Sequence, residues 1–330
     1  MILQPAVLTL LLASALTALF VAGGAWFAVG VLRGWDSGSG SERQLGLERR
    51  TYLISTLLAY AFGFQLLGLF LFVNTADALA GLLVGAMCAA GTLNANAWGY
   101  PALGLKVATF VLGGVWLVVN AVDNRAEDYP LVRVKYLFLL LLAPLVIAEA
   151  AAQAAFLLSL RADVITSCCG TQFAEGKGTL ASGLAALHVG PMRVAFFATV
   201  GAAVAAGAFF LARRRGALVV AALSAAAFAV GAASLVSFIG MYAYELPTHR
   251  CPFCVLQRDY HYVGYALYLA LLGGAVLGLG AGAIAPAGRI PSLGQVVPRV
   301  QRRLIAVSSA LWALLAAIVA WLILATDFKP

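Results

Sequence analysis

Runs of about 20 apolar residues recur along the whole of this 330-residue chain, and a run of that length can cross the core of a bilayer as one helix. Hydrophobic residues make up 63% of the sequence and charged residues only 10%. A soluble domain keeps about a quarter of its residues charged, because its surface must be wetted. The sequence therefore predicts an all-α, polytopic membrane protein, a helix bundle with short loops and no soluble domain.

Hydropathy predicts about eight transmembrane helices. They cover residues 5–33, 52–74, 101–122, 134–160, 190–212, 217–240, 262–283 and 304–325. The first run is predicted to be a span and not a cleaved signal peptide, because it lacks a basic n-region and is too long. The many Ala and Gly residues, as in AAVAAGAF and ALSAAAFAVGAASL, indicate close packing between helices.

The spans divide the chain into three parts. A four-span half is predicted at 1–160, an external cysteine loop at 161–189, and a second four-span half carrying a CxxC motif at 190–330. Within the first half, the apolar part of segment 79–98 is only about 14 residues long, which is short for a span. We expect a re-entrant or interfacial helix there.

Basic residues orient the spans. The connections after spans one, three, five and seven hold fourteen of the 21 Lys and Arg residues. Because Lys and Arg accumulate on the cytoplasmic side, both termini are predicted to lie outside, in a bacterial inner (plasma) membrane. The net charge of +8 then reflects topology and attraction to the anionic lipid bilayer, and no nucleic acid is needed to explain it.

All five cysteines fall in connections predicted to lie on the extracytoplasmic side: Cys88, Cys168, Cys169, Cys251 and Cys254. Disulfides form in that environment. An odd number of cysteines leaves at least one sulfur unpaired or shared in time between partners.

Cys251 and Cys254 form a CxxC in the stretch HRCPFCVLQRDYHY, residues 249–262. We expect the pair near the N-terminus of the seventh span, where backbone N–H groups and Arg250 or Arg258 would stabilise a thiolate. A low thiol pKa favours thiol–disulfide exchange. Two alternatives remain open: a structural bridge, or half of a zinc knuckle with His249 as a third ligand.

The run Cys251-Pro-Phe-Cys254-Val-Leu-Gln-Arg258, leading into a span, resembles the quinone-linked disulfide-bond formation protein DsbB. The vitamin K epoxide reductases share the arrangement of a CxxC before a helix. The resemblance implies that Cys251 and Cys254 pass electrons to a membrane quinone, and that Arg258 helps to hold it.

An aromatic cluster flanks the CxxC and is typical of an interfacial belt: Tyr242, Tyr244, Tyr260, His261, Tyr262 and Tyr265. A quinone headgroup would find apolar walls and hydroxyls there beside Arg258. His261 and Tyr262 are therefore candidate quinone-binding residues.

The vicinal pair Cys168 and Cys169 is the second candidate redox site. We expect it to take electrons from an external thioredoxin-like or other thiol protein and to exchange with Cys251–Cys254. The alternatives are an inert bridge to Cys88 or a soft-cation site. Cys88 has small neighbours, which are typical of a buried cysteine that only packs.

The predicted spans contain ionisable and amide side chains, among them Gln65, Lys106, Glu149 and Gln153. Glu149 is predicted either to relay protons to a quinone or to pair with Lys106. The leading functional hypothesis is a membrane thiol–disulfide oxidoreductase that exchanges electrons between external thiols and a quinone. The alternatives are a protein that binds or transports copper, zinc or mercury through its cysteines and His249, and a structural subunit of a membrane complex.

Overall fold

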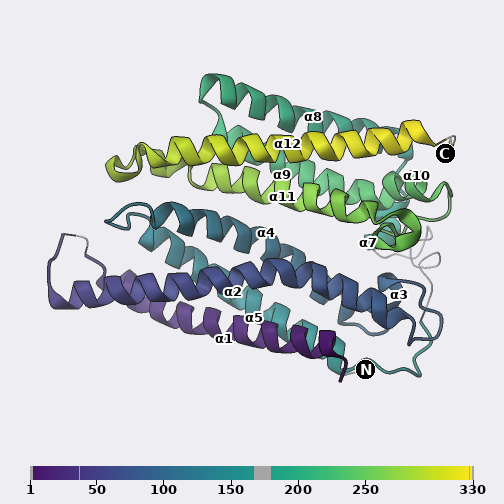
Figure 1. Ribbon diagram of the computed structural model, residues 1–330, viewed down its shortest axis with the longest axis horizontal. Helices are drawn as coiled ribbons and strands as arrows, with labels where there is room; N and C mark the ends of the chain where they lie inside the picture. The colour runs from purple at the N-terminus through teal and green to yellow at the C-terminus, as the bar shows by residue number, and fades with distance from the viewer. Residues whose placement is uncertain (1–2, 37, 167–179, 327, 329–330) are drawn as a thin grey trace. The chain divides into compact units, whose positions relative to one another are not determined.

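A computed structural model describes residues 3–36, 38–166, 180–326 and 328. The described chain is all-helical and contains eight helices that are long and apolar enough to cross a membrane (Figure 1). The predicted fold class is thereby confirmed, and the protein is an integral membrane protein.

The observed spans match the predicted ones in number and order across the described residues. They are α1 (Pro5–Gly34), α2 (Glu42–Ala80), α4 (Gly99–Asp123), α5 (Val132–Leu158), α8 (Val189–Arg213), α9 continuing into α10 (Ala217–Tyr244), α11 (Val263–Ala283) and α12 (Val296–Ala325). The largest difference is in α2, which has 39 residues where 23 were predicted. Its polar ends stay helical beyond the apolar stretch that hydropathy detects.

The described chain forms two compact units. Unit 1 comprises residues 1–75, 96–160 and 284–300, and unit 2 comprises residues 76–95, 161–283 and 301–330. The predicted boundaries at 160 and 190 remain a prediction.

Unit 1 is built around α5, which packs against α1 and α4. The ring of Trp116 lies 5.0 Å from that of Phe62, and both side chains are fully buried with Tyr136 in the same apolar cluster. Burial of such aromatic side chains supplies much of the packing between helices, because association in lipid depends on close contact.

Unit 2 is built around α9, which packs against α8 and α11. The contact depends on glycine: a Cβ on Gly278 would lie 2.1 Å from Oγ of Ser224, and one on Gly282 would lie 2.3 Å from Cβ of Ala221. The predicted close packing through small residues is confirmed here.

The helix of the sixth span is interrupted near its end. A π-helical segment at Leu235–Ile239 separates α9 (Ala217–Ser234) from the short α10 (Gly240–Tyr244). A π segment fits one extra residue into an α-helix and is frequent at functional sites. Here it directly precedes the turn of helix that carries Tyr242 and Tyr244.

Segment 79–98 does not form a long helix. It contains the end of α2, a series of turns and the five-residue helix α3 (Ala89–Leu93), which begins directly after Cys88. Whether this segment enters the bilayer or lies at its surface remains a prediction.

Candidate thiol site

Three cysteines that are far apart in the sequence meet in unit 2. Sγ of Cys88 lies 3.5 Å from Sγ of Cys251, and the sulfurs of Cys88, Cys251 and Cys254 all lie within 4.8 Å of one another. Each side chain is buried, with an exposure of 0% for Cys88, 1% for Cys251 and 5% for Cys254. We call these three residues the cysteine triad.

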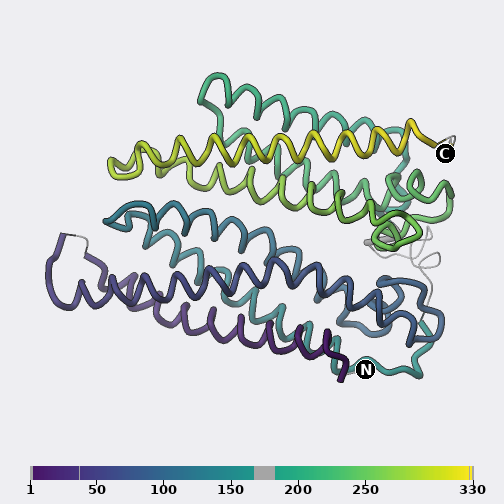
Figure 2. The backbone as a smooth tube through the Cα atoms, viewed as in Figure 1, coloured from purple at the N-terminus to yellow at the C-terminus, as the bar shows by residue number. Residues whose placement is uncertain are grey.

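The CxxC lies in the connection between α10 and α11, which can be followed in Figure 2. Two one-turn 3₁₀ helices, Cys254–Leu256 and Arg258–Tyr260, precede α11. His261 and Tyr262 then have positive φ angles of 52° and 56°, which break the helix. Because α11 begins only at Val263, the CxxC lies before the seventh span and outside its first helical turn.

Two tyrosine hydroxyls hold the backbone of the CxxC. Tyr244 Oη donates a hydrogen bond to the carbonyl of Cys251 at 2.5 Å and accepts one from the N–H of Val255 at 2.9 Å. Tyr268 Oη donates to the carbonyl of Pro252 at 2.5 Å. The loop is thus tied to α10 on one side and α11 on the other, through the carbonyls of Cys251 and Pro252 and the N–H of Val255.

A carboxylate ties the Cys88 segment to the residues that follow the CxxC. Asp77 Oδ1 accepts hydrogen bonds from the N–H of Ala89 and from Nε2 of Gln257, both at 3.0 Å. Gln257 Nε2 also lies 3.3 Å from the carbonyl of Met87. The side chains of Asp77 and Gln257 therefore join the segment that carries Cys88 to the segment that follows the CxxC.

Residues 165 and 166 are attached to the Cys88 segment. Thr166 donates its N–H to the carbonyl of Val84 at 2.9 Å and its hydroxyl to the carbonyl of Gly91 at 2.8 Å. Gly85 permits this contact, because its φ is +86° and a Cβ there would lie 2.4 Å from the carbonyl oxygen of Thr166. Any residue but glycine would be strained and would clash.

Cys168 and Cys169 lie outside the described residues, which resume at residue 180. Their predicted exchange with the CxxC therefore remains a prediction. Thr166, two positions before Cys168, is hydrogen-bonded to the segment around Cys88, at the carbonyls of Val84 and Gly91.

The three candidate quinone-binding side chains, Arg258, His261 and Tyr262, are exposed. They belong to the connection just before α11. Their predicted role is untested.

His249, the third zinc ligand considered from the sequence, does not lie with the three sulfurs of the triad. It does not belong to the cluster of metal-ligating atoms found among the described residues. Its ring instead packs edge-on against Tyr244, with the ring centroids 4.3 Å apart. The structure thus offers Cys88, and not His249, as a third ligand beside the CxxC.

Unit 1 contains a buried polar cluster among its spans. Lys106 Nζ and Glu149 Oε1 form an ion pair at 2.5 Å. Gln65 Nε2 donates to Glu149 and, at 3.2 Å, to Thr109 Oγ1. The predicted pairing of Glu149 with Lys106 is present, and the proton-relay alternative is untested. Gln153 Nε2 donates to Ser14 Oγ at 2.8 Å and links α5 to α1.

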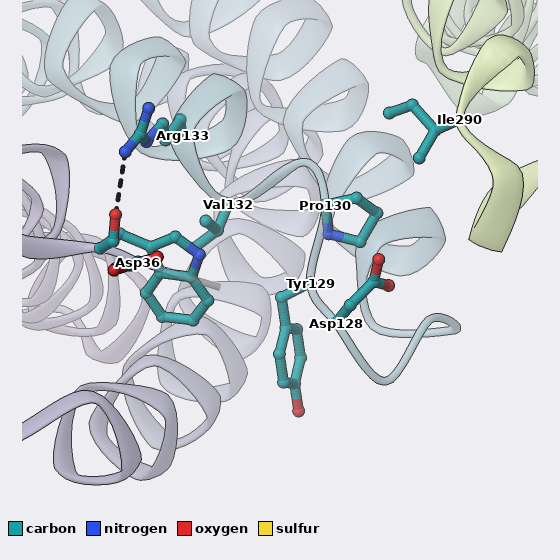
Figure 3. Close-up of a pocket in the computed structure, with 8 residues that line it drawn as sticks. Asp36, Asp128, Tyr129, Pro130, Val132, Arg133 and Ile290 are labelled. Carbon is teal, nitrogen blue, oxygen red and sulfur yellow. Dashed lines mark hydrogen bonds between the residues drawn. The ribbon is translucent and has the colours of Figure 1, made fainter. Parts of the chain in front are cut away.

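A pocket of about 360 Å³ also lies in unit 1 (Figure 3). Arg133 donates to the carbonyl of Trp35 at 2.8 Å in its wall. Desolvation by burial raises the pKa of Tyr129, and the charge of Asp123 raises it further, so that the phenol stays protonated. No cysteine lines this pocket, and the thiol site is independent of it.

Cys88 is the site residue that sequence reasoning underrated. Its neighbours Ala86, Ala89 and Ala90 carry no chemical signal, and its partner Cys251 is 163 positions away. Two features of the sequence could have identified it. Cys88 is predicted to lie on the same side of the membrane as the CxxC, and it is the one cysteine of the five that has no second cysteine near it in the sequence.

Comparisons of this chain with protein-family models, with curated proteins and with solved structures found no match.

Proposed function

We propose that the protein is a membrane thiol–disulfide oxidoreductase whose exchange site is the cysteine triad. The observation that carries the proposal is the 3.5 Å contact between the sulfurs of Cys88 and Cys251, with Cys254 in the same cluster. A structural bridge uses two sulfurs. A third sulfur within reach allows the bond to move from one pair to another.

The exchange step balances without an added oxidant. From a Cys251–Cys254 disulfide, the thiolate of Cys88 attacks the sulfur of Cys251. A Cys88–Cys251 bond forms, the Cys251–Cys254 bond breaks, and Cys254 leaves as a thiolate that takes up a proton. Cys251 is the shared sulfur in this scheme, since it has the short contact with Cys88.

The hydrogen bonds around the triad support this chemistry. Tyr244, Tyr268 and the pair Asp77–Gln257 hold the backbones that carry the three sulfurs. Exchange is fast only when the attacking sulfur is already close to its target, and positioning of this kind removes much of the entropic barrier.

The triad is buried, so a partner protein needs an intermediary, and we assign this role to Cys168 or Cys169. The chain advances at most about 3.8 Å per residue, and Thr166 is fixed to the segment that holds Cys88. The vicinal cysteines therefore begin two residues from a point anchored beside the triad. Their partner would be an extracytoplasmic thioredoxin-like or other thiol protein.

A membrane quinone is the electron acceptor or donor in this proposal. Two thiols and one quinone give one disulfide and one hydroquinone, with two electrons and two protons transferred together. The side chains of Arg258, His261 and Tyr262 support a quinone site, because they follow the CxxC and are exposed.

The test uses the full chain in lipid nanodiscs, with reduced thioredoxin as thiol donor and a short-chain benzoquinone as acceptor. Cys251→Ser, Cys254→Ser and Cys88→Ser should each abolish thiol-dependent quinone reduction above that of empty nanodiscs. The matched control is Ser234→Ala, a buried site in unit 2 whose hydroxyl has no hydrogen-bond partner among the described residues. Full turnover by both Cys88→Ser and Cys254→Ser would refute the proposal.

A further inference from the structure

We infer that the pocket at the ends of α1 and α5 binds the zwitterionic headgroup of a phosphoethanolamine lipid. The pocket has a volume of about 360 Å³ and is drawn in Figure 3. All the residues that line it belong to unit 1. The inference goes beyond the exchange function proposed above and does not depend on it.

The pocket lies where two spanning helices end. Trp35 is the C-cap of α1, Val132 is the first residue of α5, and both line the pocket. α1 has 30 residues and is therefore about 45 Å long, which matches the roughly 40–45 Å of a bilayer with its headgroups. The ends of such helices lie at the level of the headgroups, where Trp and Tyr side chains are enriched. A lipid headgroup can therefore reach this pocket directly from the bilayer.

Charged side chains of both signs line the pocket. They are Asp36, Asp128 and Arg133, and all three are exposed. None of them belongs to either of the ion pairs found among the described residues. Figure 3 shows Asp128 and Arg133 on different sides of the pocket. A ligand with one positive and one negative group can therefore contact both side chains.

The guanidinium of Arg133 is the expected contact for the phosphate of the headgroup. One of its N–H groups donates to the carbonyl of Trp35 at 2.8 Å, which orients the side chain. The guanidinium carries further N–H donors in a planar fork. These donors can bind two oxygens of one phosphate, and such charged hydrogen bonds are stronger than neutral ones.

The carboxylate of Asp128 is the expected contact for the ammonium group. Ser292 Oγ donates to its Oδ2 at 2.9 Å, and a carboxylate has about four acceptor positions, so an ammonium can bind as well. A primary ammonium donates hydrogen bonds to a carboxylate, whereas a trimethylammonium has no N–H to donate. Asp128 therefore favours ethanolamine over choline.

The charge and the size of the pocket restrict the ligand further. Two carboxylates and one guanidinium line it, so a headgroup that carries only the negative charge of a phosphate is disfavoured. The volume of about 360 Å³ is near the lower limit of the roughly 300–1,000 Å³ of small-molecule pockets. We therefore expect the headgroup to enter the pocket while the acyl chains stay in the bilayer.

The experiment measures lipid retention by native mass spectrometry on the full chain purified in detergent. The three lipids have the same acyl chains and differ in their headgroups: phosphatidylethanolamine, phosphatidylcholine and phosphatidylglycerol. We expect the apparent Kd for phosphatidylethanolamine to be about tenfold below those for the other two, which is the effect of one charged hydrogen bond.

Two substitutions test the ammonium contact. Asp128→Asn removes the charge and keeps an oxygen that can accept from Ser292, and it should raise the Kd for phosphatidylethanolamine about tenfold. Asp128→Lys should reverse the preference in favour of phosphatidylglycerol, a gain of binding that misfolding cannot produce. The matched control is Glu127→Gln, which removes the same charge at the neighbouring exposed position outside the pocket. It should keep the preference of the wild type.

Arg133→Gln tests the phosphate contact and should raise the Kd for all three lipids. An unchanged Kd in this variant would overturn the inference, because the pocket would then need only a cation. Equal retention of the three lipids by the wild type, or equal losses in Asp128→Asn and Glu127→Gln, would also overturn it. Soluble glycerophosphoethanolamine is the last test. If it binds as tightly as the lipid, the pocket belongs to a soluble zwitterion and the lipid assignment is wrong.

Discussion

The hydroxyl of Tyr244 is the smallest group whose removal should loosen the thiol site. Tyr244→Phe deletes one oxygen and leaves the ring, which packs against His249 and Tyr260 with centroid distances of 4.3 and 4.6 Å. The carbonyl of Cys251 and the N–H of Val255 then lose the partner that the structure gives them.

The cost follows from burial. Val255 is 1% exposed and Cys251 is 1% exposed, so water cannot easily replace the lost hydroxyl. A buried polar group without a partner costs about 1–3 kcal/mol. The two groups together should lower the stability of the closed loop by about 2–4 kcal/mol, because a carbonyl tolerates the loss of a partner better than an N–H does. Each 1.4 kcal/mol changes the equilibrium constant for local opening tenfold, so opening should become roughly 30- to 700-fold more frequent.

Amide hydrogen exchange followed by mass spectrometry measures this opening on peptides that contain Val255. The amide should exchange faster by that factor in Tyr244→Phe, and thiol-dependent turnover should fall with it. Tyr265→Phe is the matched control, since the structure shows no hydrogen bond from that hydroxyl among the described residues. Less than a threefold change at Val255 would show that Tyr244 does not hold the loop.

Three further predictions concern the triad, the polar cluster and the topology. Mild oxidation of the Cys254→Ser variant should form a Cys88–Cys251 disulfide, which non-reducing peptide mapping detects. The two sulfurs lie 3.5 Å apart, and they need only a small movement to reach the bonded length of about 2.05 Å. If Cys251 remains a thiol, the exchange geometry is wrong. Lys106→Met should destabilise unit 1 by about 3–5 kcal/mol, because it leaves the buried carboxylate of Glu149 without its cation. Adding Glu149→Leu should restore most of the lost stability, as measured by thermal or denaturant unfolding. A double variant as unstable as the single one contradicts the pairing. Membrane-impermeant protease or thiol reagent on spheroplasts should reach tags at both termini, and access only after lysis would reverse the topology.

Hydropathy predicted the spans well because the bilayer imposes one length scale on every helix that crosses it. It could not predict that α2 continues to Ala80. Asn74 and Asp77 lower the hydropathy of that end, yet they do not stop a helix. This continuation matters for the site, since Asp77 at the end of α2 holds both Ala89 and Gln257.

The sequence identified the CxxC as a candidate site, but it did not predict the geometry of that site. The two left-handed residues, His261 and Tyr262, separate the motif from α11, and neither residue type requires a positive φ. The meeting of Cys88 with Cys251 is a tertiary contact across 163 positions. A single sequence carries no periodicity or spacing that encodes such a contact.

The π-helical segment at Leu235–Ile239 sets the rotational phase of α10. One extra residue turns everything after it by about 100° relative to an uninterrupted α-helix. With that phase, Tyr244 reaches Cys251 and Val255, while Tyr242 packs its ring against Phe238. Deleting one residue of the π segment would remove the extra residue and leave Tyr244 in its present phase. Deleting one residue of α10 between the π segment and Tyr244 would instead rotate Tyr244 by about 100°, more than a quarter turn, away from the thiol loop. A one-residue deletion in α10 could therefore uncouple this membrane helix from the cysteines, whereas one in the π segment would not.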